Sequence, residues 1–369
     1  MIPPGACIED LATPTLLLDL DVLERNLDFM QERARHLGVR LRPHVKTHKC
    51  LEIAQMQRSR GATGITVSTL EEARAFANAG FDDITWAFPL IPSRVDEVEE
   101  IADIADLGLT VDNPEAIDAL EATGRALSTW LKVDCGYGRA GVDPTTGEAV
   151  ALARRLAASA TLRFRGCLTH AGHTYAAESP ARIMDVAESE RRVMVEFRDR
   201  LEAEGIGGVC LSVGSTPGMS LVRSLAGIQE ARPGNYALYD YTQCALGSCT
   251  LEQCAASVLS TVVSARTGSD RCVADCGALV MSKDTGTDRP VHYGRIYEGA
   301  SGGPLREDLR VASVSQEHAV ISRAMPPGTK IRILPNHSCL TVAQFDHFTV
   351  IRGSTVIDRW KIWRSRGPA

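Results

Sequence analysis

The sequence predicts an α/β fold, a (β/α)8 barrel of the TIM type followed by a smaller, mostly β domain. Eight short β-rich runs alternate with helical patterns between Thr15 and about Asp240, and apolar residues in the helical patterns recur every three to four positions. After about residue 246, strand-like runs follow one another with Gly, Pro and Asp between them and without long helical patterns. We therefore expect a barrel over residues 13–245 and a β domain over residues 246–369, with residues 1–12 packed on the β domain.

The strands of both expected domains are read from short apolar runs bounded by turn residues. The eight barrel runs are Leu16–Asp19, Val39–Pro43, Gly64–Val67, Asp83–Ala87, Leu109–Asp112, Trp130–Asp134, Arg165–His170 and Val209–Val213. The runs of the β domain are Val258–Val263, Cys272–Asp275, Lys330–Leu334, Phe348–Ile351 and Thr355–Trp363. A doubly wound open sheet is the alternative for the first domain, but it usually has fewer strands and a Gly-rich first turn, which this sequence lacks.

The composition limits the classes of function. The chain has 369 residues and a net charge of −6 at pH 7, and no basic run offsets that charge. These features argue against a protein that binds nucleic acid or anionic membranes. No apolar stretch approaches the ~20 residues that span a bilayer, and the first residues lack the pattern of a secretory signal. Eleven cysteines without a small-domain framework indicate reduced thiols, so we expect a cytoplasmic protein.

The run Arg42–Lys49 (RPHVKTHK) places a lysine, Lys46, between two histidines directly after a strand-like stretch. At the C-terminal end of a barrel strand, this lysine would face the site where such barrels carry their catalytic groups. A Schiff-base lysine must be held rigidly and must reach its neutral form, which burial and cationic neighbours favour. The positive neighbours in the run are Arg42, His44, His48 and Lys49. The same run is also typical of a solvated basic turn.

Two glycine-rich turns, Ser212–Gly218 (SVGSTPG) and Arg232–Tyr236 (RPGNY), follow the last barrel strand that the sequence predicts. Backbone amides and small hydroxyls in such turns can bind a phosphate, particularly where a helix begins. Barrels often place a phosphate site after their last two strands, which favours this interpretation. As a bare pattern, Gly-Ser-Thr-Pro is more often only a turn.

Two further segments end expected barrel strands and carry polar side chains. In Asp134–Gly141 (DCGYGRAG), glycines flank Arg139, which could donate to an anionic oxygen such as a phenolate. A surface arginine in an ordinary connection is the alternative. The segment Thr169–Tyr175 (THAGHTY) offers acid–base or ring-contact groups at the same barrel face; these are His170, His173 and Tyr175.

A possible metal site lies in the expected β domain. His337 and Cys339 are two residues apart, so on a strand they would point to the same side. Imidazole and thiolate suit zinc, but two ligands are fewer than the three usual for a catalytic zinc. A buried cysteine beside an ordinary histidine is the alternative. Cys272 and Cys276 form a weaker pair, which core thiols explain, and no role is assigned to the other cysteines.

Together these segments resemble the fold-type III pyridoxal-phosphate enzymes, which share the alanine racemase-like fold. More narrowly, the chain is similar to the family of D-serine dehydratase, D-threo-3-hydroxyaspartate dehydratase and D-threonine aldolase. The similarity covers nearly the whole chain. It is carried by Thr13-Pro14, Arg42–Lys49, Val67–Leu70, Asp134–Gly141, Leu168–Tyr175, Ser212–Pro217, Pro233–Asp240 and Pro335–Cys339.

The resemblance implies pyridoxal 5′-phosphate and Zn²⁺, or another divalent metal, as cofactors. It implies that Lys46 is the catalytic Schiff-base lysine, and that His337 and Cys339 bind the metal, which contacts the substrate's β-hydroxyl. Arg139 would contact the phenolic oxygen of the cofactor, and Arg232 would lie near its pyridine nitrogen. It also places Tyr175 beside the cofactor and the substrate, and Gly214, Ser215, Thr216, Gly234 and Asn235 around the phosphate. With Lys46, we expect Tyr175 and His173 to be catalytic, His173 because its segment offers an acid–base group at the same barrel face.

The metal pair also indicates the reaction. Aldolases of the family look like His-x-Asp here and dehydratases like His-x-Cys, so His337-Ser338-Cys339 favours dehydration of a D-configured β-hydroxy amino acid to a 2-oxo acid and ammonia. An arginine beside the pyridine nitrogen would weaken the ring as an electron sink, so we expect heavier reliance on the metal. The alternatives are a D-threonine or 3-hydroxyaspartate aldolase, an amino-acid racemase and a non-catalytic cofactor carrier. Related enzymes build their sites from two chains, which implies a homodimer.

Overall fold

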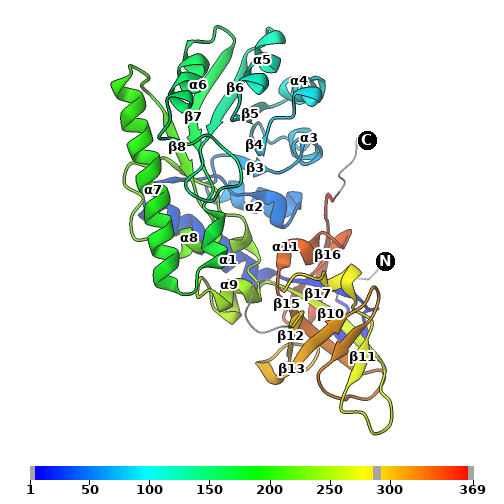
Figure 1. The fold of residues 1–369 in the computed structure, drawn as a ribbon. Coiled ribbons are helices and arrows are strands. Elements are labelled where there is room, and N and C mark those ends of the chain that lie inside the picture. Colours follow the sequence, from blue (N-terminus) through cyan, green and yellow to red (C-terminus); the bar gives the residue numbers. More distant parts are fainter. Residues whose placement is uncertain (1–4, 286–291, 365–369) are drawn as a thin grey trace. The chain divides into compact units, whose positions relative to one another are not determined.

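The structure, a computed structural model, describes residues 5–285 and 292–364, and it divides into two compact units (Figure 1). The barrel unit comprises Phe29–Lys46 and Ile53–Gly234. The β unit comprises residues 5–28, Thr47–Glu52 and the described part of Asn235–Arg364. Among the described residues, no helix combines the length and the apolar composition needed to cross a bilayer.

The barrel unit is built on eight parallel strands in the order β2-β9-β8-β7-β6-β5-β4-β3. The strands are β2 (Arg40–Leu41), β3 (Ile65–Val67), β4 (Asp83–Pro89), β5 (Asp106–Val111), β6 (Leu127–Lys132), β7 (Leu162–Leu168), β8 (Cys210–Val213) and β9 (Glu230–Ala231). A parallel bridge between His44 and Thr66 joins the two ends of this sheet, and the amide of Thr66 donates to the carbonyl of Pro43 at 2.8 Å. These bonds close the barrel, which confirms the predicted fold.

Helices follow the barrel strands, and side-chain caps determine where most of them begin. They are α2 (Leu51–Ser59), α3 (Leu70–Asn78), α4 (Val95–Ala102), α5 (Pro114–Ala122), α6 (Gly147–Ala158), α7 (Pro180–Ala203) and α8 (Thr216–Leu221), with α1 (Leu20–His36) preceding β2. The capping side chains accept a hydrogen bond from the first turn of α3, α5, α6, α7 and α8; they are Thr69, Asn113, Thr146, Ser179 and Ser215. Each cap fixes the end of a strand-to-helix loop.

The β unit contains a nine-stranded sheet in the order β11-β14-β13-β12-β15-β10-β1-β16-β17. The strands are β1 (Thr15–Asp19), β10 (Ala256–Ser264), β11 (Cys272–Ala274), β12 (Gly294–Tyr297), β13 (Leu305–Val314), β14 (Ala319–Ile321), β15 (Lys330–Pro335), β16 (His347–Arg352) and β17 (Thr355–Lys361). Its described helices are short: α9 (Tyr241–Ala245), α10 (Ala278–Met281) and α11 (Ser338–Val342). A buried cluster joins the N-terminal segment to this sheet; it contains Ile8, Leu11, Leu17, Leu259, Ile351 and Val356.

The first of the eight predicted barrel runs is wrong. Leu16–Asp19 lies in β1, which pairs with β10 and β16 in the sheet of the β unit. A central strand of a mixed sheet is buried on both faces, so its apolar run looks the same as a barrel strand. The eighth barrel strand is β9, Glu230–Ala231, whose two residues carry no recognisable periodicity. The other seven runs overlap barrel strands.

Candidate active site

Most of the predicted cofactor-binding residues lie at one rim of the barrel, where the parallel strands end. Lys46 lies in the 3-10 helix η2 (Val45–Thr47), which follows β2, and its side chain is exposed. Arg139 follows β6, Tyr175 follows β7, and Gly214 follows β8. Because the carboxyl ends of parallel strands meet at one end of a barrel, the topology brings these segments to the rim that carries catalysis in this architecture.

The segment after β6 is held by a carboxylate. The Asp134 Oδ1 atom accepts hydrogen bonds from the amides of Gly136, Tyr137 and Gly138 at 2.9 to 3.1 Å. The Arg139 guanidinium is exposed and lies over the Tyr137 ring, 5.1 Å from its centroid. The Asp134 carboxylate therefore holds the backbone of the loop, and the exposed Arg139 can donate to an anion.

The segment after β7 carries two histidines with different surroundings. The His170 Nδ1 atom lies 3.2 Å from the carbonyl of Gly214, and burial together with the charge of Lys46 lowers the pKa of His170 well below its usual range. His173 stacks on Tyr137 with ring centroids 5.8 Å apart, and burial also lowers the pKa of His173. The Nδ1 atom of His173 is buried without a hydrogen-bond partner among the described residues.

Tyr175 shares a 3-10 helix with His173, η4 (Gly172–Ala176), and its side chain is half-buried. This helix approaches the preceding loop very closely. A Cβ atom at Gly172 would lie 2.3 Å from a ring carbon of Tyr137, so a larger residue there would displace the Tyr137 ring. The close contact fixes the position of η4, and with it His173 and Tyr175, at the rim.

The turn after β8 has the shape expected of a phosphate loop. Gly214 has a φ of 117°, and a Cβ atom there would lie 3.2 Å from the amide nitrogen of Arg232. The Ser215 Oγ atom accepts from the Gly218 amide at 3.2 Å and lies 3.0 Å from the Thr174 hydroxyl, so it caps α8. Thr216, the first residue of α8, is buried. Gly214, Ser215 and Thr216 thus lie where α8 begins at the rim, and their binding of a phosphate stays a prediction.

Glu190, a residue that the sequence analysis did not single out, joins these two rim segments. It lies on α7, and its Oε1 atom accepts from the amides of Ala171 at 2.9 Å and Gly214 at 3.4 Å. Burial raises the pKa of Glu190 above its usual range. A glutamate in a long amphipathic helix carries no sequence signal for such a role.

Arg232 and Lys132 place two more basic groups inside the barrel. Arg232 is 5% exposed and donates to the Ser212 hydroxyl and to the carbonyl of Thr169. Lys132 ends β6 and is 6% exposed; burial and the charges of Arg232 and Arg139 lower its pKa to about 7. Sequence reasoning missed Lys132, because a lysine at a strand end usually reaches solvent.

In the β unit, His337 and Cys339 meet, but not on a strand. Strand β15 ends at Pro335, His337 is the N-cap residue of α11, and Cys339 lies in the first turn of that helix. Their side chains nevertheless interact: although burial disfavours both charged forms, the Cys339 thiolate raises the pKa of His337 to about 11, and His337 lowers the pKa of Cys339. The prediction of a strand was wrong, and the extended N-cap followed by a helical turn brings the two groups together instead.

Two groups of the β unit hold this pair in place. The Asp284 Oδ2 atom lies 2.6 Å from the His337 Nδ1 atom, which directs the other ring nitrogen, Nε2, toward a ligand. The Thr47 hydroxyl lies 3.3 Å from the Cys339 sulfur. Sequence reasoning missed Asp284, since nothing in the spacing of 53 residues links it to His337.

Asn235, which the resemblance assigns to the phosphate, directs its side chain toward the segment of His337 and Cys339. Its Nδ2 atom donates to Asp240 Oδ2 at 2.7 Å and to the Ser338 hydroxyl at 3.0 Å. The same Asp240 oxygen accepts from the Ser338 amide at 2.9 Å. Asp240 is buried and therefore fixes the residue between His337 and Cys339. Gly234, at the end of the barrel unit, is half-buried.

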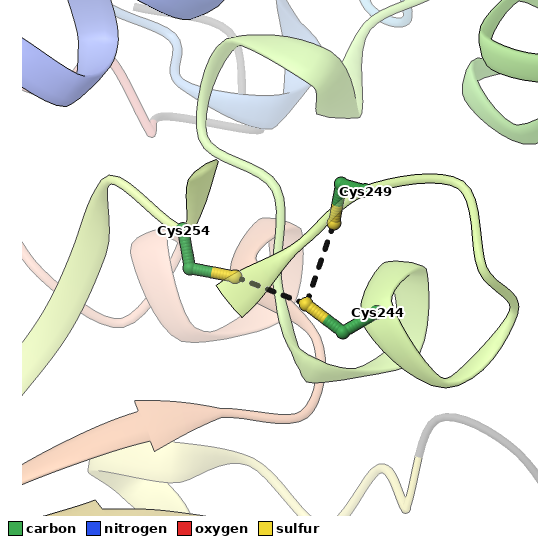
Figure 2. Close-up of side chains that lie close together, drawn as sticks. All are labelled: Cys244, Cys249 and Cys254. Carbon is green, nitrogen blue, oxygen red and sulfur yellow. Dashed lines mark hydrogen bonds between the residues drawn. The ribbon is translucent and has the colours of Figure 1, made fainter. Parts of the chain in front are cut away.

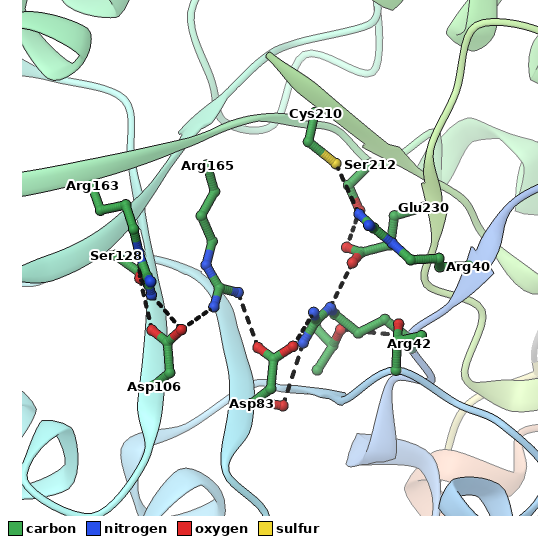
Figure 3. Close-up of polar contacts among 12 residues, drawn as sticks. Arg40, Arg42, Asp83, Asp106, Ser128, Arg163, Arg165, Cys210, Ser212 and Glu230 are labelled. Atoms are coloured by element: carbon green, nitrogen blue, oxygen red, sulfur yellow. Dashed lines mark hydrogen bonds and ion pairs between the residues drawn. The ribbon is translucent and has the colours of Figure 1, made fainter. Parts of the chain in front are cut away.

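The opposite end of the barrel contains a cavity of about 280 Å³, which is lined by paired charges. Arg42 donates to Glu230 at 2.7 Å and to Asp83 at 2.6 Å (Figure 3). Despite burial, these bonds and the charge of Arg165 lower the pKa of Asp83. Arg42 therefore does not supply positive charge around Lys46, as the sequence analysis expected. It stabilises the N-terminal ends of the strands, a face of this fold where such groups serve stability.

Two family models together match most of the chain. The family model "Alanine racemase, N-terminal domain" matches residues 18–242, and the model "Putative serine dehydratase domain" matches residues 255–351. D-threo-3-hydroxyaspartate dehydratase of Delftia sp. is 35% identical, over 95% of this chain and 97% of that protein. D-serine dehydratase of Dictyostelium discoideum is 35% identical, over 95% of this chain and 96% of that protein.

The chain belongs to the D-serine dehydratase-like family. The solved structure of D-threo-3-hydroxyaspartate dehydratase from Delftia sp. has a TM-score of 0.92 at 34% identity, over 96% of this chain and 98% of that one. The D-serine dehydratase-like family also has relatives with another activity. The 3-hydroxy-D-aspartate aldolase of Paracoccus denitrificans is 30% identical, over 97% of this chain and 93% of that protein.

Proposed function

We propose that this chain is a lyase, dependent on pyridoxal phosphate and a divalent metal, that dehydrates a β-hydroxy D-amino acid to a 2-oxo acid and ammonia. The observation that carries the proposal is the imidazole–thiol pair His337–Cys339 with Asp284 behind the imidazole. A racemase of this fold needs no such pair. Two solved mutants of D-threo-3-hydroxyaspartate dehydratase change a histidine and a cysteine two residues apart, and the cysteine mutant is described as metal-free.

The rim of the barrel unit fits pyridoxal phosphate in its chemistry. Lys46 is exposed, as covalent attachment of an aldehyde requires. Arg139 is also exposed, and its guanidinium can donate to an anionic ring oxygen. The turn Gly214–Thr216 leads into α8, and a Cβ atom at Gly214 would crowd the backbone at Arg232, just after β9. When bound, the cofactor supplies an electron sink for the carbanion at the substrate's α-carbon.

Lys46 is the residue that we assign to removal of the α-proton. A lysine amine in its neutral form can accept a proton as a general base. Because Lys46 is exposed, its amine can separate from the cofactor and accept the proton from the substrate's α-carbon. We propose that His173 and Tyr175 border the substrate, since η4 fixes both at this rim.

His337 and Cys339 are the residues that would hold the metal. The Asp284 hydrogen bond to Nδ1 leaves Nε2 of His337 as the ligand atom, and the lowered pKa of Cys339 favours the thiolate that zinc prefers. The ion supplies a Lewis acid that makes the β-hydroxyl a better leaving group. Thr47, whose hydroxyl lies beside Cys339, follows Lys46 directly in the chain.

The aldolase is the second candidate, because it requires the same lysine and the same type of metal. In an aldolase the bond between the α- and β-carbons breaks. The metal would then stabilise the deprotonated β-hydroxyl, whereas in a dehydratase it would help the β-hydroxyl to leave. We propose dehydration because the second ligand is a thiol, as the resemblance implies for the dehydratases, and not a carboxylate.

The experiment that tests the proposal supplies the holoenzyme with D-serine, D-threonine and D-threo-3-hydroxyaspartate, with the L-isomers as controls. Pyruvate, 2-oxobutanoate or oxaloacetate should form together with one ammonia per turnover. Removal of the metal should abolish ammonia release while the cofactor stays bound to Lys46. Activity that persists after the metal is removed would refute the role of His337 and Cys339.

We further propose that the enzyme is a homodimer, because related enzymes with the alanine racemase-like fold build their sites from two chains. Light scattering on the purified holoenzyme should give twice the chain mass of 39.8 kDa. A monomer that retains full activity would contradict this assignment.

A further inference from the structure

Three cysteines of the β unit bring their sulfur atoms together apart from His337 and Cys339. Cys244 lies in α9, Cys249 in the following loop, and Cys254 at the end of the 3-10 helix η6 (Leu251–Gln253). The Cys244 sulfur lies 3.4 Å from the sulfur of Cys249 and 3.4 Å from that of Cys254. Figure 2 shows the three side chains converging on one point. We name these residues the three-cysteine cluster.

The sulfur spacing is that of a metal site rather than of a disulfide. Zinc–sulfur bonds of about 2.3 Å place two thiolates of a tetrahedral site about 3.8 Å apart. The three sulfurs all lie within 4.8 Å of one another, so the three-cysteine cluster needs at most about 1 Å of adjustment around an ion. A disulfide joins two sulfurs at about 2.05 Å and would leave the third cysteine unused. Among the described residues, no other group of three such ligands occurs.

The loop that carries the three cysteines is held in this shape by its own hydrogen bonds. The Ser248 amide donates to the carbonyl of Gln243 at 3.0 Å, and the Thr250 amide donates to the Gln253 side chain at 2.9 Å. The Asn26 side chain, from outside the loop, donates to the carbonyl of Gln253 at 2.7 Å. The convergence of the sulfurs is therefore built into an ordered backbone, which lowers the cost of ion binding.

The surroundings favour a positive ion. Two carboxylates, Asp240 and Glu252, act electrostatically on the Cys244 sulfur. Cys244 and Cys249 are half-buried, so the three-cysteine cluster is not sealed in an apolar core and an ion can enter. Three thiolates beside two carboxylates would repel one another strongly, and a thiophilic cation removes that repulsion.

We propose that Cys244, Cys249 and Cys254 bind one thiophilic cation, zinc in the reduced enzyme, as a structural site separate from the pair His337–Cys339. Three thiolates occupy three positions of the tetrahedron, and water takes the fourth. Binding replaces three S–H protons with the ion and changes no oxidation state. The ion ties α9 to η6 across the spacing Cys-x4-Cys-x4-Cys.

The site would also steady the metal pair through Asp240. Its Oδ1 atom caps α9 by accepting from the Gln243 amide at 3.0 Å, while Oδ2 accepts from the Ser338 amide. An ion at Cys244 would therefore fix the helix that Asp240 begins, and through it the backbone between His337 and Cys339. The three-cysteine cluster has no contact of its own with substrate in this proposal.

Zinc stoichiometry tests the proposal. The full-length holoenzyme is stripped of metal under reducing conditions, reloaded with zinc and passed through a desalting column, and bound zinc is counted by atomic emission. Wild type should hold two ions per chain, C244S one, C339S one, and C244S/C339S none. The matched control Cys7→Ser removes a half-buried cysteine of the same unit and should keep two.

The pattern separates this proposal from the proposed function. One ion in wild type that is lost in C339S but kept in C244S overturns the three-cysteine cluster and leaves the dehydratase site intact. One ion that is lost in C244S but kept in C339S supports the cluster and overturns the metal role of His337 and Cys339.

A second measurement covers the case in which C244S folds poorly. In the C339S background, with all three cysteines present, zinc should protect Cys244, Cys249 and Cys254 from alkylation, read by peptide mass spectrometry. Cys7 should alkylate equally with and without zinc. Equal alkylation of the three cysteines in both samples, or a disulfide among them in protein purified without reductant and lacking the second zinc, overturns the proposal.

Discussion

At the scale of single residues, the two lysines of the run Arg42–Lys49 differ in what their side chains can reach. Lys46 is exposed, whereas Lys49 is 5% exposed and has a φ of 48°. A buried lysine in a left-handed backbone conformation serves the local fold, while an exposed amine at the barrel rim can react with an aldehyde. The pattern of the run does not separate the two, because both stand in the same basic turn, and only the family resemblance selected Lys46.

We expect borohydride reduction of the holoenzyme to attach the pyridoxyl group to Lys46. Lys46→Arg should abolish this label and lower kcat on the order of a hundredfold or more, because arginine keeps the charge but forms no Schiff base. Lys49→Arg, the matched control, should keep the label. Labelling that survives in K46R and disappears in K49R would contradict the assignment.

The lowered pKa of Lys132 predicts that the stability of the folded protein depends on pH. Its pKa in the folded protein is about 7 and its ordinary value is 10.5, so between these values the unfolded chain binds the extra proton. Stability should therefore rise with pH in this window, by about 1.4 kcal/mol per pH unit from this residue, and the effect should vanish below pH 7. Urea unfolding of cofactor-free wild type and Lys132→Met at pH 7, 8 and 9 measures the difference. Parallel stability curves would show that Lys132 is charged in the folded protein.

The contact between Asp284 and His337 should strengthen metal binding. A carboxylate that holds the second nitrogen of a metal-binding histidine typically contributes 10- to 100-fold in affinity. We expect Asp284→Asn to weaken zinc binding at His337 by about that factor, measured by competition with a chromophoric chelator in the C244S background. Asp270→Asn, an exposed aspartate whose side chain is 89% accessible, is the control and should bind zinc like the parent. Unchanged affinity in D284N would remove Asp284 from the site.

At the scale of elements, apolar periodicity predicts a strand only where the run is long enough. It does not show which sheet the strand joins, because that depends on the strands with which it pairs. Seven barrel strands and the long strands β10, β15, β16 and β17 follow from the sequence. Strand β9 has two residues and was missed, β13 was missed because its charged residues break the apolar pattern, and β1 was assigned to the wrong sheet. The pair His337–Cys339 was found for a wrong reason, since a helix N-terminus rather than a strand unites it.

Long-range polar partners had no sequence signal. Glu190 supports two rim loops from α7, and Asp240 fixes Ser338 from 98 residues away. Nothing local marks such residues, because a buried carboxylate differs from a surface one only in the amides that surround it in the fold. The three-cysteine cluster did have a signal, its equal spacing, which thiols scattered elsewhere in the chain obscured.

The charged network at the N-terminal end of the barrel predicts a loss of stability without a loss of chemistry. Glu230 is buried and accepts from Arg42 at 2.7 Å and from the Ser212 hydroxyl at 2.6 Å. Glu230→Gln leaves the Arg42 charge buried with one partner fewer, which should lower the free energy of unfolding by roughly 3 kcal/mol. In the control Glu204→Gln, which breaks the exposed pair with Arg154, the loss should stay below about 1 kcal/mol. Urea unfolding measures both, and equal losses would contradict a structural role for the network.

At the scale of the whole molecule, the chain divides its chemistry between two compact units. The barrel unit carries the exposed lysine, the basic groups and the turn Gly214–Thr216, and the β unit carries the imidazole–thiol pair. An enzyme of this kind can lose one half of its chemistry and keep the other. Pyridoxal phosphate should therefore stay attached to Lys46 after metal is removed, and zinc should stay bound at Cys339 in the K46R variant.

Elimination of water and cleavage of the bond between the α- and β-carbons give different products, and one measurement separates the two. The holoenzyme is incubated with D-threo-3-hydroxyaspartate, and ammonia and glycine are quantified in the same sample. We predict ammonia and oxaloacetate in equal amounts, without glycine. Glycine and glyoxylate in equal amounts, without ammonia, would contradict the account and identify the enzyme as an aldolase.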